Sequence, residues 1–313
     1  MHDSSQPWFG IGGVLVAAGG LVVLLAAPTF VSRYTVISLN SILMYLVLTV
    51  SWAAFCGPTN YISLASAAFF GVGIYTSATL GTAVPLPVLT LVGGLLSFGL
   101  AFLVGLSSLR LRGMYFTIFT FGLSELIRHA VLWWEVNITG TVGRVVFSVG
   151  DVTVYYSMIA IALATVIGAY CLQVSRFGLA LRGIGESEEA ADHIGINVDL
   201  IKIVTFAGTS FFMGCAGVVM ATRWTYIDPS IAFNPLFSFM PVLMAIFGGI
   251  RNIRGQVVGA VALTLLADLL LTTFPYYYNL LYGIILVAVI LFMPQGLTGF
   301  LERARNWARA AQA

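Results

Sequence analysis

The residues that could do chemistry in this sequence gather in one polar stretch, residues 175–202, and the chain on both sides of it is apolar. Adjacent carboxylates at Glu188 and Glu189 would point to different sides of a helix, so they do not form a catalytic acid pair. No apolar run within the stretch approaches the roughly 20 residues that cross a bilayer, so we expect it to lie in water between two membrane spans. Its charged and titratable side chains are Arg176, Arg182, Glu186, Glu188, Glu189, Asp192, His193, Asp199 and Lys202.

Sequence signatures of enzymes, metal sites and nucleotide binding are missing. There is no G-x-x-x-x-G-K-[ST] phosphate loop, so the chain itself should not bind ATP in that manner. His2, His129 and His193 are scattered, and no His, Cys, Asp and Glu residues have the spacing of metal ligands. We therefore expect no catalytic residue, no metal, no cofactor and no nucleic-acid partner, and any transport would draw its energy from another subunit.

The composition indicates a membrane protein. Hydrophobic residues make up 59% of the chain and charged residues 8%, whereas soluble domains have about 25% charged residues. Long unbroken apolar runs such as Leu86–Leu106 and Met158–Leu172 are typical of helices rather than of alternating barrel strands. The predicted fold is all-α, a single transmembrane domain over residues 1–313 with about ten spans.

Two of the predicted spans are short or broken. Tyr61–Ala83 is rich in small residues and follows Gly57-Pro58, and Leu236–Ile250 begins after Pro235 and contains Pro241. Interrupted helices occur at membrane depth where protein or a water-filled cavity covers the backbone, so both are candidates to line a pathway. The full set of predicted spans is Gly10–Val31, Thr35–Phe55, Tyr61–Ala83, Leu86–Leu109, Met114–Trp134, Tyr155–Val174, Ile203–Thr222, Leu236–Ile250, Val257–Phe274 and Leu280–Met293.

Basic residues predict the orientation. With both termini in the cytoplasm and alternating spans, the outer side keeps Arg33, Arg128, Arg144 and Arg223. The inner side then holds most of the basic residues, as the positive-inside rule requires. Stretch 175–202 and the tail 294–313 are therefore predicted to be cytoplasmic. The inner set is Arg110, Arg112, Arg176, Arg182, Lys202, Arg251, Arg254, Arg303, Arg305 and Arg309.

Within the polar stretch, Glu186 to His193 is predicted to form a short helix. Ser187 is a suitable N-cap, the acidic residues lie near the positive end of the helix dipole, and Gly195 is a natural stop. A short surface helix held between two membrane spans can receive force from a soluble partner.

The sequence Glu189-Ala190-Ala191, followed after three residues by Gly195-Ile196, resembles the EAA-type coupling loop of ABC-importer permeases. With Ser175–Arg182 before it, the stretch is similar to the branched-chain amino acid permease family, its LivM branch in particular. The resemblance implies that the loop docks into a groove on the ATP-binding subunit. The residues implied in this coupling are Glu186, Glu188, Glu189, Ala190, Ala191 and Gly195.

Further segments extend this resemblance from about Gly57 to Gly299. They are Ala67–Tyr75, Leu109–Phe116, Phe247–Ile250 with Arg254-Gly255, and Met293–Leu297. The family resembles type II importers, which implies about ten helices per permease and a homologous second permease, giving a heterodimer. It also implies two ATP-binding subunits, a periplasmic solute-binding protein, a small-molecule substrate and a location among the lipids of a bacterial inner membrane.

Two segments depart from the family pattern. This chain has Ser63-Leu64-Ala65-Ser66-Ala67 where the family usually has Ser-Leu-Gly-His-Ala, and Thr139-Gly140-Thr141 where it has Thr-Gly-Gly. Both departures lie where a solute or a binding protein could pass, so the transported solute stays open.

Charged residues inside predicted spans are a second group of candidates. Glu125 and Asp268 lie deep in spans, where an unpaired charge costs about 2.5–3.5 kcal/mol, so each must face a partner or a cavity. Arg128 follows Glu125 by three positions, which favours an intrahelical ion pair, with contact to the solute as the alternative. Asp268 could pair with Arg128 or Arg223, or lie in water near the outer surface. The candidate pathway residues are Ser63, Ser66, Phe69, Glu125, Arg128 and Asp268.

These observations predict the permease subunit of an ABC importer for branched-chain or related amino acids. The alternative within the same architecture is a permease for urea, short amides or another small polar solute. The alternative of a different class is an autonomous channel or ion-coupled transporter that uses Glu125, Arg128 and Asp268 as a relay.

Overall fold

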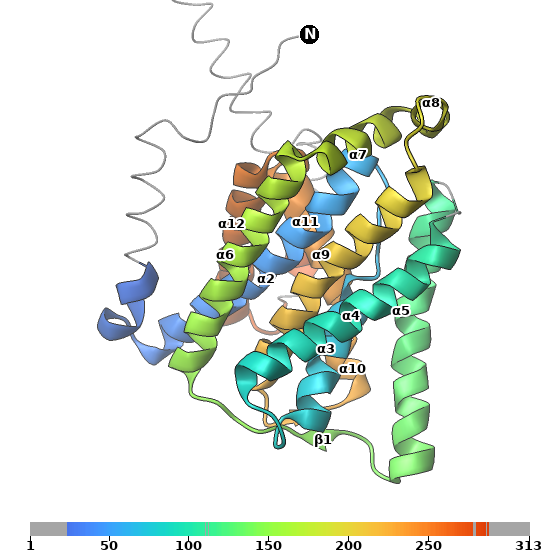
Figure 1. Cartoon of the computed structure of the whole chain (residues 1–313). Coiled ribbons are helices and arrows are strands. Elements are labelled where there is room, and N and C mark those ends of the chain that lie inside the picture. Colours follow the sequence, from blue (N-terminus) through green and yellow to red (C-terminus); the bar gives the residue numbers. More distant parts are fainter. Residues whose placement is uncertain (1–23, 110, 112, 278–279, 286, 288–313) are drawn as a thin grey trace, which may run out of the picture.

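The computed structural model describes residues 24–109, 111, 113–277, 280–285 and 287, and most of these residues are helical (Figure 1). The predicted all-α class is confirmed, and one small sheet pairs β1 (Arg144–Val145) with β2 (Tyr226–Ile227) in antiparallel fashion. The helices whose bounds both lie within the described residues are α2 (Arg33–Thr59), α3 (Ser66–Leu80), α4 (Leu86–Ser108), α5 (Met114–Trp134), the π-helix η1 (Glu135–Thr139), α6 (Asp151–Val174), α7 (Arg176–Glu186), α8 (Glu188–His193), α9 (Val198–Ala221), α10 (Pro229–Ala232), α11 (Leu236–Gly248) and α12 (Ile253–Thr273).

The long helices run between two ends of the molecule (Figure 1). At the α7–α8 end, Asn60 beyond the end of α2 donates a hydrogen bond to the carbonyl oxygen of Gly185 in α7, at 2.9 Å. At the β1–β2 end, Arg33 at the start of α2 forms a 2.7 Å ion pair with Asp151 at the start of α6. Loops along the chain therefore alternate between the two ends, as the predicted order of spans requires.

Helices α2 and α9 form the centre of the molecule, and most of their residues are buried. The close packing of α3 on α9 depends on small residues. A side-chain carbon built on Gly73 would lie 2.1 Å from the carbonyl oxygen of Gly214, so the two backbones could not approach so closely with any larger residue. Small residues serve helix packing in membranes because lipid chains provide no hydrophobic driving force between helices.

Six stretches of the described residues are long and apolar enough to cross a membrane. Several helices begin earlier than the predicted spans, because their first turns are polar. Helix α9 begins at Val198 rather than Ile203, and α12 begins at Ile253 rather than Val257. The six stretches are Arg33–Thr59, Leu86–Ser108, Asp151–Val174, Val198–Ala221, Pro229–Gly248 and Ile253–Thr273.

The ends of the predicted topology are not tested by the structure. The tail 294–313, most of the predicted span Gly10–Val31 and half of the predicted span Leu280–Met293 lie outside the described residues. The total of about ten spans and the location of both termini therefore stay predictions.

Both spans predicted to be short or broken are so in the structure. Helix α3 has 15 residues and α11 has 13, which is about 20–22 Å at 1.5 Å per residue and less than the hydrocarbon core of about 30 Å. A non-helical strap, residues 60–65, precedes α3. The short helix α10 precedes α11.

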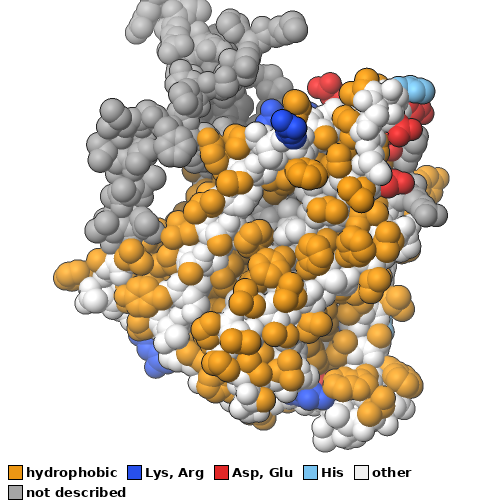
Figure 2. Space-filling view, viewed as in Figure 1, with side chains coloured by type: hydrophobic (Ala, Val, Ile, Leu, Met, Phe, Trp, Pro, Cys, Tyr) orange, Lys and Arg blue, Asp and Glu red, His pale blue; other side chains and the backbone are white. Residues whose placement is uncertain are grey.

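The surface has the layout of a membrane protein. Figure 2 shows one face, where apolar side chains cover the middle and charged side chains gather toward the two ends. Large apolar side chains are exposed on the long helices, for example Leu103 of α4 at 67% and Ile167 of α6 at 59%. Such a surface is stable in lipid and would be a liability in water.

At the β1–β2 end, the loop that follows η1 is fastened to the bundle by a buried carboxylate. Glu135 is completely buried and accepts a 2.8 Å hydrogen bond from the backbone N–H of Gly143. Arg144 lies 3.6 Å from the other carboxylate oxygen and stacks over the ring of Trp134 at 4.7 Å. The predicted outer segment Thr139–Thr141 is thus part of an anchored loop.

Candidate functional site at the α7–α8 loop

The polar stretch 175–202 forms α7, α8 and the first residues of α9, where one helix was predicted. Ser187 caps α8 by accepting a hydrogen bond from the backbone N–H of Ala190, and Gly195 adopts φ +84° just beyond the helix. Both predictions, the N-cap and the stop, are confirmed. The predicted start at Glu186 is wrong, because Glu186 is the last residue of α7 and the helix begins again only after Ser187.

Helix α7 was missed by the sequence analysis, although a local signal was present. Ser175 is its N-cap and accepts from the backbone N–H of Gly178. Gly178, Leu181 and Ile184 are its buried residues, at the three-residue spacing of a single helix face. The glycine content of the segment obscured that pattern.

Helix α8 projects from its end of the molecule (Figure 1). Ala191 is 2% exposed and faces the bundle, whereas Glu186, Glu189, Ala190 and Gly195 are all exposed. Ile194, just after the helix, is 77% exposed. The loop thus offers a small acidic and apolar surface to a partner.

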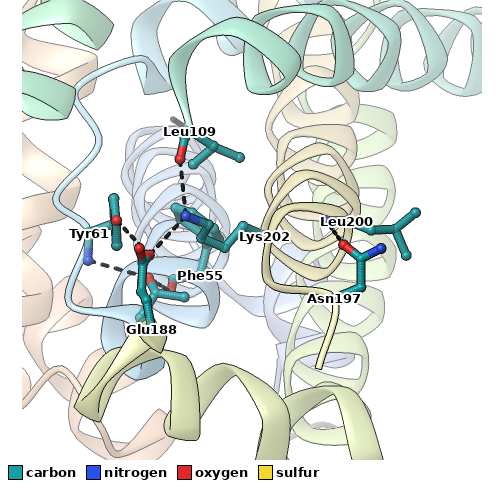
Figure 3. Close-up of polar contacts among 8 residues, drawn as sticks. Phe55, Tyr61, Leu109, Glu188, Asn197, Leu200 and Lys202 are labelled. Carbon is teal, nitrogen blue, oxygen red and sulfur yellow. Dashed lines mark hydrogen bonds and ion pairs between the residues drawn. The ribbon is translucent and has the colours of Figure 1, made fainter. Parts of the chain in front are cut away.

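Glu188 points the other way, into the molecule, where it meets Lys202 of α9 (Figure 3). The Lys202 ammonium lies 2.8 Å from Glu188 Oε1 and donates a second hydrogen bond, at 3.0 Å, to the carbonyl oxygen of Leu109. The Tyr61 hydroxyl donates to the same Glu188 oxygen at 2.6 Å. The Lys202 ammonium also lies 4.9 Å from the centre of the Tyr61 ring.

This ion pair fixes α8 to the bundle. The side chain of Lys202 is 2% exposed and that of Glu188 is 16% exposed. Removal of one partner from a buried pair leaves an uncompensated charge and costs about 3–5 kcal/mol. Glu188 therefore positions α8, whereas Glu189 next to it faces outward.

Lys202 was predicted to lie in the aqueous loop, and the structure corrects this. Asn197 caps α9 by accepting a 3.1 Å hydrogen bond from the backbone N–H of Leu200 (Figure 3). The helix therefore starts at Val198, and its second turn brings Lys202 inside the protein. The Asn197 cap was the sequence signal that could have revealed this.

An open pocket of about 360 Å³ lies beside the ion pair. Its walls come from residues 59–61 at the end of α2, from Gly113 before α5 and from residues 184–189 at the α7–α8 junction. Three segments that are far apart in the sequence thus meet at the base of α8.

The candidate pathway residues do not gather at one place. Ser63, Ser66 and Phe69 are at most 3% exposed and lie in the core, where the Phe69 ring packs against Phe206 with 5.3 Å between the ring centres. In the described structure they face protein rather than an open channel. A role for them in the pathway stays a prediction.

Glu125 and Arg128 form the predicted intrahelical ion pair on α5, with nitrogen–oxygen distances of 2.5 and 2.9 Å. Both side chains are about a quarter exposed, at 26% and 27%. Helix α5 itself lies at the edge of the bundle (Figure 1). It buries only Phe116, Thr120 and Ser124, one narrow stripe.

Asp268 is not paired with either predicted arginine. Its carboxylate accepts hydrogen bonds from the hydroxyls of Ser38, at 2.6 Å, and Tyr34, at 3.3 Å, both on α2. These partners could not be inferred from sequence, because they lie more than two hundred positions away.

Comparison with known proteins identifies the family. The family described as "Branched-chain amino acid transport system / permease component" matches residues 34–290. The chain belongs to this family of permeases. It is a transport subunit rather than an enzyme, and a multi-pass membrane protein.

Individual relatives agree with this assignment. The permease is 26% identical to LivM of Salmonella typhimurium and of Escherichia coli, permease proteins of a high-affinity branched-chain amino acid transport system, over 88% of this chain and 73% of each relative. It is 30% identical to the permease protein LivH of Escherichia coli over 41% of both chains. No solved structure matches the permease.

Proposed function

We propose that the permease forms part of the translocation pathway of an ABC importer for branched-chain or related amino acids in a bacterial inner membrane. Its α7–α8 end faces the cytoplasm, where α8 docks on one of two ATP-binding subunits. Glu186, Glu189, Ala190 and Gly195 make the docking surface. Glu188 and Ala191 hold that surface to the bundle.

The observation that carries this proposal is the opposite orientation of two neighbouring acids. An exposed helix transmits force only if it cannot move independently of the spans behind it. Lys202, buried in α9, binds Glu188 and also the end of α4 through Leu109. A partner that pushes α8 therefore moves several spans together.

A second permease would complete the pathway along α5. The exposed side of α5 has large apolar side chains, including Ile118 at 65% and Leu126 at 64%, and the Glu125–Arg128 pair, whose side chains are about a quarter exposed. A surface that is apolar with a few polar groups suits a subunit interface beside a solute route. LivM and LivH, both named as permease proteins of branched-chain amino acid transport, support a heterodimer.

At the opposite end, the anchored loop between η1 and β1 would face the periplasm and receive the solute-binding protein. The solute class is supported by the names of the LivM and LivH relatives. The permease is also 26% identical over 43% of its length to the xylose permease protein XylH of Haemophilus influenzae. Family membership alone therefore does not fix the solute, and urea and short amides belong in the test.

The test is uptake by the complex that copurifies with a tagged permease, reconstituted in liposomes. We expect ATP-dependent accumulation of radiolabelled leucine, isoleucine or valine when the solute-binding protein is present. Glu189→Arg and Gly195→Val should abolish this uptake without loss of membrane insertion. Gly195→Val acts because φ +84° is strained for a β-branched residue.

The contrary outcomes are distinct. Flux of solute or ions through the permease alone, without ATP, would indicate an autonomous channel. Uptake of urea or an amide in place of leucine would keep the ABC architecture and change the solute. Unchanged ATP-dependent uptake in both variants would reject α8 as the coupling element.

A further inference from the structure

We propose that the strap, residues 60–65, transmits the movement of α8 to α5, with Tyr61, Thr117 and Thr120 as its positioning residues. This inference rests on the proposed function, in which α8 receives force from the ATP-binding subunits. It adds the route by which that force reaches the helix at the edge of the bundle.

The first part of the route joins the α7–α8 junction to the start of the strap. Asn60 donates a 2.9 Å hydrogen bond to the Gly185 carbonyl oxygen, and Tyr61 donates a 2.6 Å hydrogen bond to Glu188. The contact is also tight in space, because a side-chain carbon on Gly185 would lie 2.0 Å from the carbonyl oxygen of Pro58. A shift of α8 therefore displaces Asn60 and Tyr61 with it.

The second part joins the strap to α5. The Thr117 hydroxyl donates to the carbonyl oxygen of Ile62 at 2.8 Å, and the Thr120 hydroxyl accepts from the backbone N–H of Leu64 at 3.0 Å. These contacts are about one turn apart in the N-terminal half of α5. That half begins beside Gly113, which lines the pocket at the base of α8. Because α5 buries only one narrow stripe of its own, two hydrogen bonds to the strap are a substantial part of its attachment.

The third part is a fixed pivot at the far end of the strap. The Ser238 hydroxyl of α11 accepts from the backbone N–H of Ala67 at 3.0 Å and donates to the carbonyl oxygen of Leu64 at 2.7 Å. Trp52 of α2 donates to the carbonyl oxygen of Ser63 at 2.7 Å. Side chains of neighbouring helices thus satisfy the strap, as non-helical backbone within a membrane requires.

Within the strap, the backbone N–H of Ala65 donates to the Ser63 hydroxyl at 3.3 Å, close to the end that α11 and α2 hold. The end at Tyr61 can therefore swing without breaking this hydrogen bond. The end at Tyr61 follows α8, while the end at Leu64 is held by α11 and α2. The contact of Thr117 with Ile62 lies between these two ends, and the contact of Thr120 with Leu64 lies at the held end. Movement of Tyr61 therefore changes the tilt of α5 relative to the core.

The test compares transport with ATP hydrolysis in the reconstituted complex. Tyr61→Phe removes only the hydroxyl that binds Glu188, and Thr120→Val removes only the hydroxyl that binds Leu64. For each we expect the amount of leucine accumulated per ATP hydrolysed to fall about tenfold, as expected for loss of a hydrogen bond to a charged or buried group. The yield of complex and its rate of ATP hydrolysis should stay unchanged.

Matched controls lie outside the route. Tyr155→Phe removes a hydroxyl that donates to the carbonyl oxygen of Leu24 at 2.8 Å. Thr165→Val removes a buried hydroxyl that bonds within its own helix, to Ile161 at 2.7 Å. Both should transport the wild-type amount of leucine per ATP.

Two results would overturn the inference. In the first, the strap variants transport as much leucine per ATP hydrolysed as the wild type. In the second, uptake by the variants falls only as far as the yield of complex and its rate of ATP hydrolysis fall, which is the result expected of a merely structural role. Failure of the proposed function is separate, because the wild-type complex would then show no ATP-dependent uptake and both proposals would be lost.

Discussion

Glu188 and Glu189 are adjacent, carry the same charge and have different surroundings. Glu188 binds Lys202 and Tyr61 inside the protein, and Glu189 is exposed on α8. The stability of the fold and the proposed coupling to a partner are thus divided between neighbours. Two substitutions with the same chemistry can separate these roles.

We expect Glu188→Ala to lower the free energy of unfolding by about 3–5 kcal/mol, because it leaves the ammonium of Lys202 buried without its counter-charge. Glu189→Ala should change stability by less than about 1 kcal/mol, as is usual for an exposed charge. Thermal unfolding of the purified permease in detergent, followed by tryptophan fluorescence, measures both.

Glu189→Ala is the control for Glu188→Ala, and a further variant separates the charge of Glu188 from its hydrogen bond. Glu188→Gln keeps a hydrogen-bond acceptor for Tyr61 but not the charge, so its stability should lie between those of Glu188→Ala and the wild type. Equal effects of Glu188→Ala and Glu189→Ala would contradict the inward orientation of Glu188.

At the scale of elements, α5 is a long helix that buries only three of its own residues, Phe116, Thr120 and Ser124. Its Glu125–Arg128 pair is a quarter exposed, so the charges either hold the helix in the membrane or contact the solute. An unpaired charge at the centre of a span costs about 2.5–3.5 kcal/mol, whereas a paired one is tolerated. Single and double substitutions distinguish these roles.

We expect Arg128→Gln alone to reduce the yield of assembled complex, because it leaves Glu125 unpaired. The double variant Glu125→Gln and Arg128→Gln should restore both yield and uptake if the pair is structural. Complex yield by size-exclusion chromatography and uptake in liposomes give the two readouts. A double variant that assembles fully and does not transport would instead place these charges on the solute route.

The features that could be predicted well are those specified by residues close together in the sequence. The Ser187 cap, the Gly195 stop and the Glu125–Arg128 pair all depend on partners within a few positions. The start of α9 was missed because apolar runs mark where a helix enters lipid, not where its first turn begins at Asn197. The strap was predicted only as a break, because its partners Trp52, Thr117, Thr120 and Ser238 become neighbours only in the folded chain.

At the scale of the whole molecule, the permease is an apolar bundle with two different ends. One end projects α8, and the other folds a loop over the buried Glu135. The strap and the short helices α3 and α11 lie between them, where a membrane protein can change shape with little loss of backbone hydrogen bonding. This asymmetry suits the proposed importer, in which ATP-binding subunits act on one end and the solute-binding protein delivers the solute at the other.

The central claim is that α8 contacts an ATP-binding subunit on the cytoplasmic side, and cysteine cross-linking tests it most directly. The background is Cys171→Ser, since Cys171 is exposed whereas Cys56 and Cys215 are buried. Ala190→Cys on α8 should cross-link to the ATP-binding subunit, with a yield that changes when ATP is added. Thr141→Cys, exposed at the opposite end, should not cross-link to that subunit. Labelling of Ala190→Cys by an impermeant thiol reagent added outside intact cells, with no cross-link to the ATP-binding subunit, would contradict the account.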